Sequence, residues 1–203
     1  MIAIIDYRAG NLRSVERALK HLGLACYITD NPEKIMSAER VIFPGVGAAG
    51  KAMETIRELK IDETISSVIA QGKPFLGICL GTQIIFDSSE EDSAVCLGII
   101  PGMVRRFPEM SEKVPHMGWN RLILKKSHPL LHGIGGDEWF YFVHSYYPDP
   151  SRNEDVVART SYRIEFASAV CRANVFATQF HPEKSGHPGL KILENFSRWD
   201  GRE

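Results

Sequence analysis

The sequence predicts an α/β protein of three layers, in which helices cover both faces of a mixed, mostly parallel sheet. Strand-like and helix-like segments alternate through the first half of the 203 residues, and such alternation is typical of parallel strands joined by crossover helices. The second half consists mainly of short apolar runs, so we expect antiparallel strands to join the sheet there. Hydrophobic residues are 44% of the chain, which is ordinary for a globular protein, and the length suits a single domain over residues 1–203.

Each element of the first half has a local signal. Helical spacing of apolar residues begins behind Asn11, a residue type favoured at helix caps, and Gly23 is a typical stop. The predicted strands span residues 1–6, 25–28, 41–43 and 74–78. The predicted helices begin near residues 12, 51, 61 and 84.

The second half is richer in strand signals. The apolar runs predict strands over residues 97–100, 104–107, 122–124, 139–143, 156–159, 167–171 and 175–180. A final helix after Pro188 presents Leu190, Leu193 and Phe196 on one face. We find no internal repeat, no low-complexity segment and no linker.

Composition excludes several classes of protein. Lys and Arg number 24 against 25 Asp and Glu, so no overall charge points to nucleic acid or to a membrane surface. The first residues form an apolar run without a basic segment before it, which indicates a strand and not a signal peptide. No apolar run approaches membrane-spanning length. The four cysteines are widely spaced, which indicates reduced thiols and a cytoplasmic location.

The histidines do not predict a metal site. His128 and His132 have the spacing of a helical ligand pair, but Pro129 and Gly133 argue against a helix there. We therefore expect neither a metal nor another cofactor.

A cysteine lies between two glycines just after the apolar run 74–78. Gly77 and Gly81 stand two positions either side of Cys79, which is the thiol form of the nucleophile elbow, a sharp strand-to-helix turn. Such a turn exposes the sulfur at the sheet edge and leaves backbone N–H groups free to hold an oxyanion. The helix N-terminus behind the turn favours the thiolate. A buried structural cysteine is the alternative, and this segment alone leaves the two equally open.

A second apolar strand, residues 175–180, leads directly into a histidine. His181 follows the strand and Glu183 stands two residues later, where its carboxylate can orient the imidazole. Both Cys79 and His181 follow strands, and open α/β sheets place their ligand sites at that edge. A nucleophile, a base and an orienting carboxylate are the set that acyl transfer needs.

Residues 44–50, Pro-Gly-Val-Gly-Ala-Ala-Gly, form a glycine-rich loop after the strand 41–43. The pattern matches the G-x-G-x-x-G dinucleotide fingerprint, but it is not on the first strand and no acid-ending strand follows at the expected distance. A different use of such a loop is to direct a backbone N–H at a developing oxyanion, together with that of Leu80. We favour this second use.

Several segments together resemble the class I, or triad, glutamine amidotransferases. Residues 77–83 resemble the nucleophile motif of that family and residues 180–183 its His/Glu motif. Among these proteins, the chain is similar to the glutaminase subunits of imidazole glycerol phosphate synthases. The segments that carry this finer resemblance are residues 6–12, 44–47, 114–120, 141–146 and 179–185. Two departures from the family pattern are Arg8, where glycine is expected, and Thr82, where methionine is commoner.

The resemblance implies the three-layer, flavodoxin-like fold and a role for each matched residue. The catalytic residues would be Cys79, His181 and Glu183. The oxyanion would be held by the backbone of Leu80, Val46 and Gly47. The glutamine pocket would be lined by Gly45, Gln83, His144, Ser145 and Tyr146. The partner interface would include Met117, Trp119 and Lys184.

The resemblance also implies a partner, because ammonia released from glutamine must reach an acceptor on another chain. That partner would be a (β/α)8-barrel cyclase subunit of histidine biosynthesis. Three alternatives stay open at this point: a glutaminase serving another synthase or a sugar-modifying system, a non-catalytic binding module on the same scaffold, and a dinucleotide-dependent oxidoreductase.

Overall fold

The computed structural model describes residues 1–8, 10–109 and 113–202. Its main sheet follows the predicted α/β plan, and eight strands belong to it among these residues. In spatial order they are β2 (Cys26–Thr29), β1 (Ile2–Ile5), β3 (Arg40–Gly45), β4 (Phe75–Cys79), β14 (Val175–Thr178), β13 (Ile164–Arg172), β12 (Val156–Tyr162) and β9 (Ile123–Leu124). The strands from β2 to β14 run parallel, and the last three are antiparallel.

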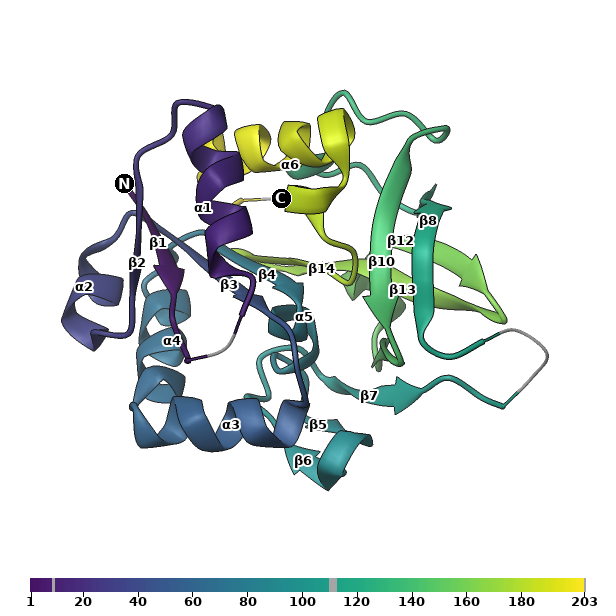
Figure 1. Ribbon diagram of the computed structural model, residues 1–203, viewed down its shortest axis with the longest axis horizontal. Coiled ribbons are helices and arrows are strands. Elements are labelled where there is room, and N and C mark those ends of the chain that lie inside the picture. The colour runs from purple at the N-terminus through teal and green to yellow at the C-terminus, as the bar shows by residue number, and fades with distance from the viewer. Residues whose placement is uncertain (9, 110–112, 203) are drawn as a thin grey trace.

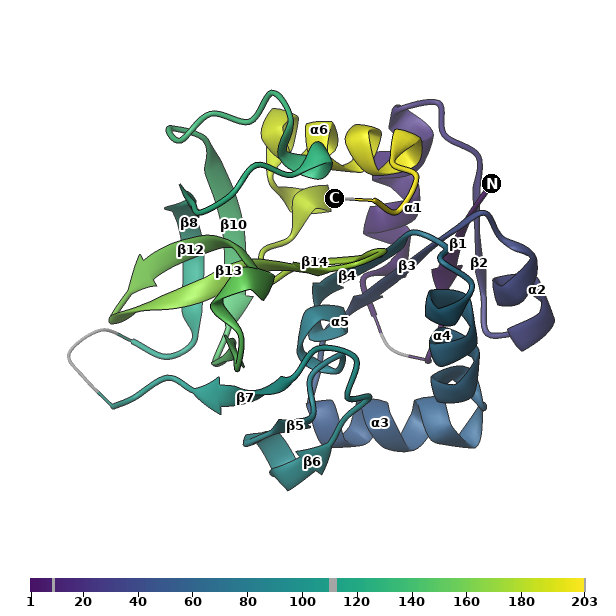
Figure 2. The same cartoon turned by 180° about the vertical axis from the view of Figure 1, so that it is seen from behind.

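Helices cover this sheet on both sides, as Figures 1 and 2 show. The α-helices are α1 (Leu12–His21), α2 (Pro32–Ser37), α3 (Ala49–Glu58), α4 (Ile61–Ala70), α5 (Leu80–Gln83) and α6 (Gly186–Arg198). Short 3₁₀ helices span η1 (Glu91–Ser93), η2 (Pro129–Leu131), η3 (Asn153–Asp155) and η4 (Pro182–Lys184). In both views α1 and α6 lie on one side of the sheet, and α3 and α4 lie on the other.

Alternation along the strands explains the two layers. In β1, Ala3 and Ile5 belong to the core cluster that also contains buried residues of α3 and α4. Ile2 and Ile4 belong to the second cluster, which contains buried residues of α1 and α6. Successive strand residues point to opposite faces, so a strand that is apolar throughout is covered on both sides.

Two smaller sheets lie beside the late strands. Strands β8 (His116–Arg121) and β10 (Trp139–His144) form an antiparallel pair. The other small sheet has the order β11 (Tyr146–Pro150), β7 (Gly102–Arg106), β5 (Ser88–Ser89) and β6 (Ala94–Val95). The sequence analysis did not predict β8, β11 or α2. Strand β8 contains no apolar run, and β11 contains two prolines, which its place at a sheet edge allows.

Two predictions around the elbow are wrong, and they share one cause. We expected a helix from residue 84 and a strand over residues 97–100, but α5 ends at Gln83 and residues 97–100 form no strand. The N–H groups of residues 97–100 donate to the carbonyls of Ile84, Ile85 and Phe86. A continuing helix would need those carbonyls for its own hydrogen bonds, so the loop and the helix exclude each other.

Candidate active site

Cys79 lies at a sharp turn between β4 and α5. Its backbone has φ 55° and ψ −101°, a conformation that costs energy in any residue other than glycine. A Cβ on Gly77 would lie 2.7 Å from the Gly81 carbonyl oxygen, and a Cβ on Gly81 would overlap the carbonyl of Phe43. Both glycines are therefore required by close backbone approach, which is the geometry of a nucleophile elbow.

His181 and Glu183 lie just beyond the end of the neighbouring strand β14. The parallel pairing places Ile78 beside Thr178, so Cys79 and His181 emerge at the same edge of the sheet. The imidazole Nδ1 lies 2.8 Å from Glu183 Oε1, and both side chains are almost completely buried. Because Nδ1 donates to this carboxylate, the other ring nitrogen is the one available to a thiol.

The second ring nitrogen of His181, Nε2, is available to the sulfur of Cys79. Nε2 is buried and has no hydrogen-bond partner of ordinary geometry among the described residues. Burial by itself lowers the pKa of His181, but the charge and hydrogen bonding of Cys79, followed by those of Glu183, raise it to about 10. His181 is therefore protonated at neutral pH, and an imidazolium beside a thiol is the arrangement that activates a cysteine nucleophile.

Asn11 has a different task from the one we predicted. Its side chain makes no capping hydrogen bond to α1, and its Nδ2 donates instead to Glu183 Oε1. The same carboxylate oxygen accepts from His181, so Asn11 helps to hold the carboxylate against the imidazole.

A hydrogen-bonded pair of glutamines lies beside the thiol, Gln179 just after β14 and Gln83 at the end of α5. Gln179, fully buried, donates through Nε2 to the sulfur of Cys79 over 3.7 Å. Its Oε1 accepts from Gln83 Nε2 at 3.2 Å, and Gln83 also donates to the Tyr146 carbonyl at 3.1 Å. A fixed donor on the sulfur stabilises a thiolate.

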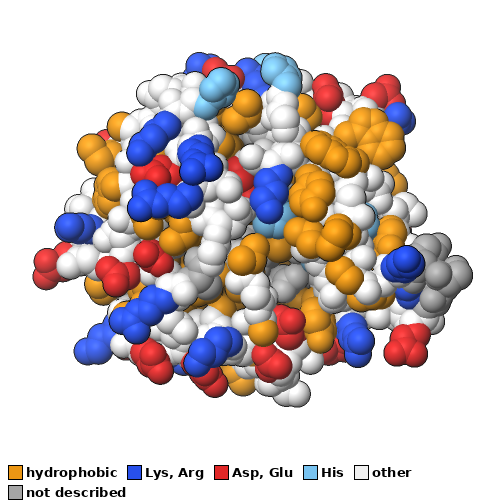
Figure 3. All heavy atoms as spheres, viewed as in Figure 1, with side chains coloured by type: hydrophobic (Ala, Val, Ile, Leu, Met, Phe, Trp, Pro, Cys, Tyr) orange, Lys and Arg blue, Asp and Glu red, His pale blue; other side chains and the backbone are white. Residues whose placement is uncertain are grey.

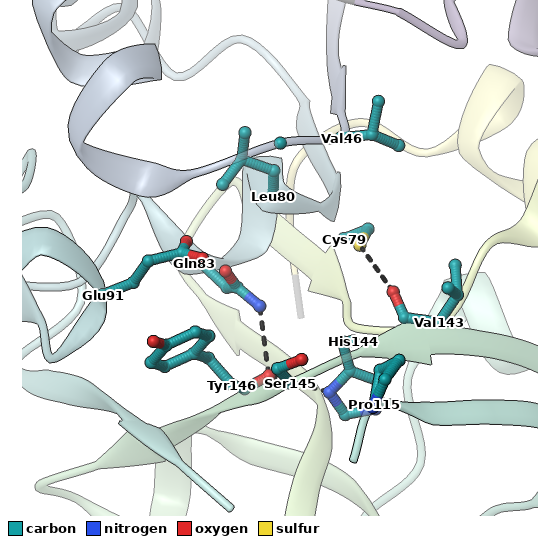
Figure 4. A pocket seen from close by; sticks show the side chains of 11 residues that line it. Val46, Cys79, Leu80, Gln83, Glu91, Pro115, Val143, His144, Ser145 and Tyr146 are labelled. Atoms are coloured by element: carbon teal, nitrogen blue, oxygen red, sulfur yellow. Dashed lines mark hydrogen bonds between the residues drawn. The ribbon is translucent and has the colours of Figure 1, made fainter.

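A pocket of about 290 Å³ opens above the sulfur, and Figure 4 shows its lining. Most of the residues that the sequence assigned to the oxyanion and to glutamine meet there. They are Val46, Gly47, Leu80, Gln83, His144, Ser145 and Tyr146, and the nucleophile Cys79 lines the pocket with them. Gly45 does not line it but pairs with Cys79 across β3 and β4.

Glu91, which the sequence analysis missed, also lines this pocket. It lies in the 3₁₀ helix η1, and its Oε2 accepts from the N–H of Ala49 at 2.8 Å. Burial raises the pKa of Glu91, although the bond from Ala49 lowers it in part. No local motif marks this carboxylate, because its place depends on how η1 packs against α3.

His144 reaches the pocket through a pair of buried histidines. His144 Nδ1 lies 2.7 Å from the carbonyl of Tyr146, and its Nε2 lies 3.0 Å from His116 Nδ1. Both imidazoles are therefore neutral donors through Nδ1. Burial lowers the pKa of His116 to about 4, and burial followed by the nearby histidines lowers that of His144 to about 3.

The predicted interface residues share one surface beside the site. Met117 and Trp119 on β8 are 63% and 54% exposed, so Trp119 is not an ordinary core aromatic. The rings of Trp119 and Tyr141 are 5.8 Å apart, and Lys184 Nζ lies 5.8 Å from the Tyr141 ring. Figure 3 shows hydrophobic side chains gathered on this side of the molecule, around β8 and β10.

A second Cys–His contact does not have the same chemistry. Cys171 Sγ lies 3.2 Å from His128 Nε2, but His128 Nδ1 accepts from the N–H of Leu130. The proton of a neutral His128 is therefore on Nε2, facing the sulfur, so this imidazole cannot act as a base toward Cys171.

In the described part of the chain, no group of three or more His, Cys, Asp or Glu could hold a metal ion. No helix among residues 1–8, 10–109 and 113–202 has the length and apolar character needed to cross a membrane.

The chain belongs to the class I glutamine amidotransferases. It matches the family described as "Glutamine amidotransferase class-I" over residues 3–198, which confirms the resemblance seen in the two motifs. Among similar proteins is imidazole glycerol phosphate synthase subunit HisH of Nitratidesulfovibrio vulgaris, 50% identical over 98% of this chain and 96% of that one. Subunit HisH of Methanothermobacter thermautotrophicus is 51% identical over 97% of both chains.

Solved structures confirm the predicted fold. A structure titled "Structure of PurLQS from Thermotoga maritima" superposes with a TM-score of 0.77 at 20% identity and covers 97% of both chains. A "Crystal structure of glutamine amidotransferase" gives a TM-score of 0.73 at 22% identity, over 97% of this chain and all of the other.

Proposed function

We propose that this chain is the glutaminase subunit of an imidazole glycerol phosphate synthase. It hydrolyses glutamine to glutamate and ammonia and passes the ammonia to a cyclase subunit in histidine biosynthesis. One observation carries the proposal: a thiol on a strained elbow lies beside a buried His181–Glu183 pair at the floor of a pocket. The names of relatives that are half identical over nearly the whole chain support the choice of synthase.

The chemistry follows from the positions of the three catalytic groups. The Cys79 thiolate attacks the side-chain amide carbon of glutamine and forms a tetrahedral oxyanion. The N–H of Leu80 is one of the first helical amides, which lack an acceptor inside the helix, and it holds this oxyanion. His181 then gives its Nε2 proton to the departing ammonia and leaves a glutamyl thioester.

The second half-reaction uses the same groups in reverse. His181 takes a proton from a water molecule, which attacks the thioester and releases glutamate and the thiolate. Glu183, held by Asn11, keeps the imidazole in the one tautomer that both steps require.

The pocket suits the free amino acid. Its lining includes the Glu91 carboxylate and the Gln83 amide on the side away from the sulfur (Figure 4). Glu91 would pair with the α-ammonium group of glutamine. Gly45 would keep the adjoining loop close, and the backbone of Ser145 and Tyr146, braced by His144, would contact the rest of the substrate.

The partner that we propose is a (β/α)8-barrel cyclase docked on the surface that carries Met117, Trp119 and Lys184. It would use the ammonia on a phosphoribulosyl-formimino aminoimidazole carboxamide ribonucleotide and release imidazole glycerol phosphate and aminoimidazole carboxamide ribotide. Ammonia in neutral water is mostly ammonium, which is not nucleophilic, so direct transfer across this interface keeps it reactive. A cytoplasmic location and one domain over residues 1–203 remain part of the proposal, and four free cysteines support the first.

The test compares Cys79→Ala with Cys171→Ala, which removes a buried thiol next to the other histidine. In complex with the cyclase, Cys79→Ala should lose glutamine-dependent synthesis and keep ammonia-dependent synthesis. Cys171→Ala should keep both. Normal glutamine hydrolysis by Cys79→Ala would end the proposal, and so would a wild-type complex that uses ammonia but never glutamine.

A further inference from the structure

Tyr7, at the end of β1, holds both backbone polar groups of Val46. Its hydroxyl oxygen accepts from the Val46 N–H at 3.0 Å and donates to the Val46 carbonyl at 3.1 Å. The two residues are 39 positions apart, so the contact is made by the fold and not by a local turn. One hydroxyl thus fixes the orientation of the peptide groups on both sides of Val46.

This contact removes a donor from the candidate oxyanion site. The sequence assigned the N–H of Val46 to the oxyanion, but an N–H that donates to Tyr7 is not directed at the space above Cys79. Val46 and Gly47 separate two cavities, and among the described residues Tyr7 lines the second cavity and not the pocket of the thiol. Figure 4 shows the Val46 side chain directed away from the sulfur. The site therefore has the Leu80 donor in place and lacks the one that Val46 would supply.

The tyrosine is the rigid member of this contact. Tyr7 is 2% exposed, and its ring stacks on Phe43 with centroids 5.0 Å apart. Burial raises the pKa of Tyr7, so the hydroxyl stays protonated and able to donate. A Cβ on Gly45 would overlap this hydroxyl, so glycine is required where the loop passes it.

The loop, by contrast, can turn. Gly47 has φ 111°, a backbone region open chiefly to glycine. The cavity behind the loop has a volume of about 340 Å³ and gives the peptide and the Val46 side chain room to move. Turning the Val46 N–H toward the thiol pocket breaks its hydrogen bond to the Tyr7 hydroxyl.

We propose that Tyr7 is a positioning residue that holds the Val46 peptide out of the oxyanion site until the partner is bound. The inference rests on the proposed function and implies that the isolated chain is slower than its complex with the cyclase. Only a minor fraction of the free chain directs the Val46 N–H at the oxyanion, and docking of the cyclase has to overcome the contact with Tyr7.

The experiment measures glutamine hydrolysis by the full-length chain, alone and with the cyclase subunit, for wild type, Tyr7→Phe and Tyr27→Phe. Tyr27→Phe is a matched control, because it deletes a hydroxyl that donates to the Lys34 carbonyl at 2.7 Å in an exposed position. Tyr7→Phe should raise kcat of the isolated chain about tenfold, with KM unchanged, because one buried hydrogen-bonded group is worth about that factor. The activation by the partner should fall by the same factor. Tyr27→Phe should change neither.

The outcomes separate this inference from the function on which it rests. A Tyr7→Phe protein that melts at a lower temperature but shows wild-type kcat and wild-type activation has only lost a structural contact, which overturns the inference alone. A lower kcat in the isolated variant would also overturn it, since Tyr7 would then support the active loop. A wild-type chain that hydrolyses no glutamine with or without the partner would remove the proposed function and the inference together.

Discussion

Acid should destabilise this protein through the buried histidine pair His116 and His144. Each imidazole donates through Nδ1, to His144 and to the Tyr146 carbonyl respectively. A proton added to His144 Nε2 would face the N–H of His116, and one added to His116 Nε2 would face the amide nitrogen of Asn120 at 3.4 Å. Asn120 cannot simply turn over, because its oxygen accepts from Arg121 N and its nitrogen donates to the Ser161 carbonyl.

The size of the effect follows from the pKa shifts. Both histidines have pKa values lowered by burial, to about 4 and about 3, from an ordinary value of 6.5. A histidine whose pKa is lower in the folded protein than in the unfolded chain stabilises the fold above pH 6.5. This stabilisation is lost as the pH falls from 6.5 toward the pKa in the folded protein. As the pH falls from 7 to 5, each of the two histidines therefore lowers the free energy of unfolding of the protein by about 2 kcal/mol. The pair loses about 4 kcal/mol, a large part of the roughly 5–15 kcal/mol typical of a domain.

His181 does not cancel this loss. Its pKa is raised to about 10, so its contribution is fully present below 6.5 and is lost only as the pH rises toward 10. Between pH 7 and pH 5 it changes by less than about 1 kcal/mol, and in the opposite direction.

The assay is urea unfolding at pH 7 and pH 5 for wild type, His116→Phe and His187→Asn. Phenylalanine suits the site, because the His116 ring stacks on Phe142 and Tyr162, while His187 is an exposed histidine of α6. Between pH 7 and pH 5, His116→Phe should lose about 2 kcal/mol less of its free energy of unfolding than wild type loses. His187→Asn should lose as much as wild type. If wild type and His116→Phe lose stability in parallel, burial does not exclude the charge and the reasoning fails.

Two further predictions concern positioning and docking. Asn11→Ala should lower kcat about tenfold with little change in KM, because Glu183 loses a hydrogen-bond donor. The control Asn31→Ala removes the side chain that caps α2, so it should lower the melting temperature and leave kcat unchanged. Equal kcat values for the two variants would refute the role of Asn11. Trp119→Ala should fold normally and bind the cyclase subunit at least tenfold more weakly in a titration. The control Val95→Ala changes an exposed residue of β6 and should bind like wild type. Full-strength binding by Trp119→Ala would exclude Trp119 as an anchor of the interface.

Local rules explain which parts of the site could be predicted. The elbow follows from two glycines around Cys79, and the position of His181 follows from an apolar strand that ends just before it. Helical spacing located α1, α4 and α6 to within a few residues. The wrong predictions at residues 84 and 97–100 arose because hydrogen bonds between these two segments replaced the regular structure that each would form alone.

Residues that act through distant contacts carried no such signal. Tyr7 is an ordinary apolar residue after a strand, and only its contact with Val46 assigns it a task. Asn11 has the composition of a helix cap, but it serves a carboxylate 172 positions away.

The sequence by itself determined the class of fold, the thiol at a strained turn and the order of nucleophile, base and carboxylate along the chain, because each depends on neighbours within one turn or one strand. Only the tertiary structure decided that β4 and β14 are adjacent in a register that brings Cys79 to His181, that Gln179 faces the sulfur, and that Val46 is bound to Tyr7. The physical reason is that strand order and register minimise the free energy of the whole packed chain, and no short segment determines that minimum by itself.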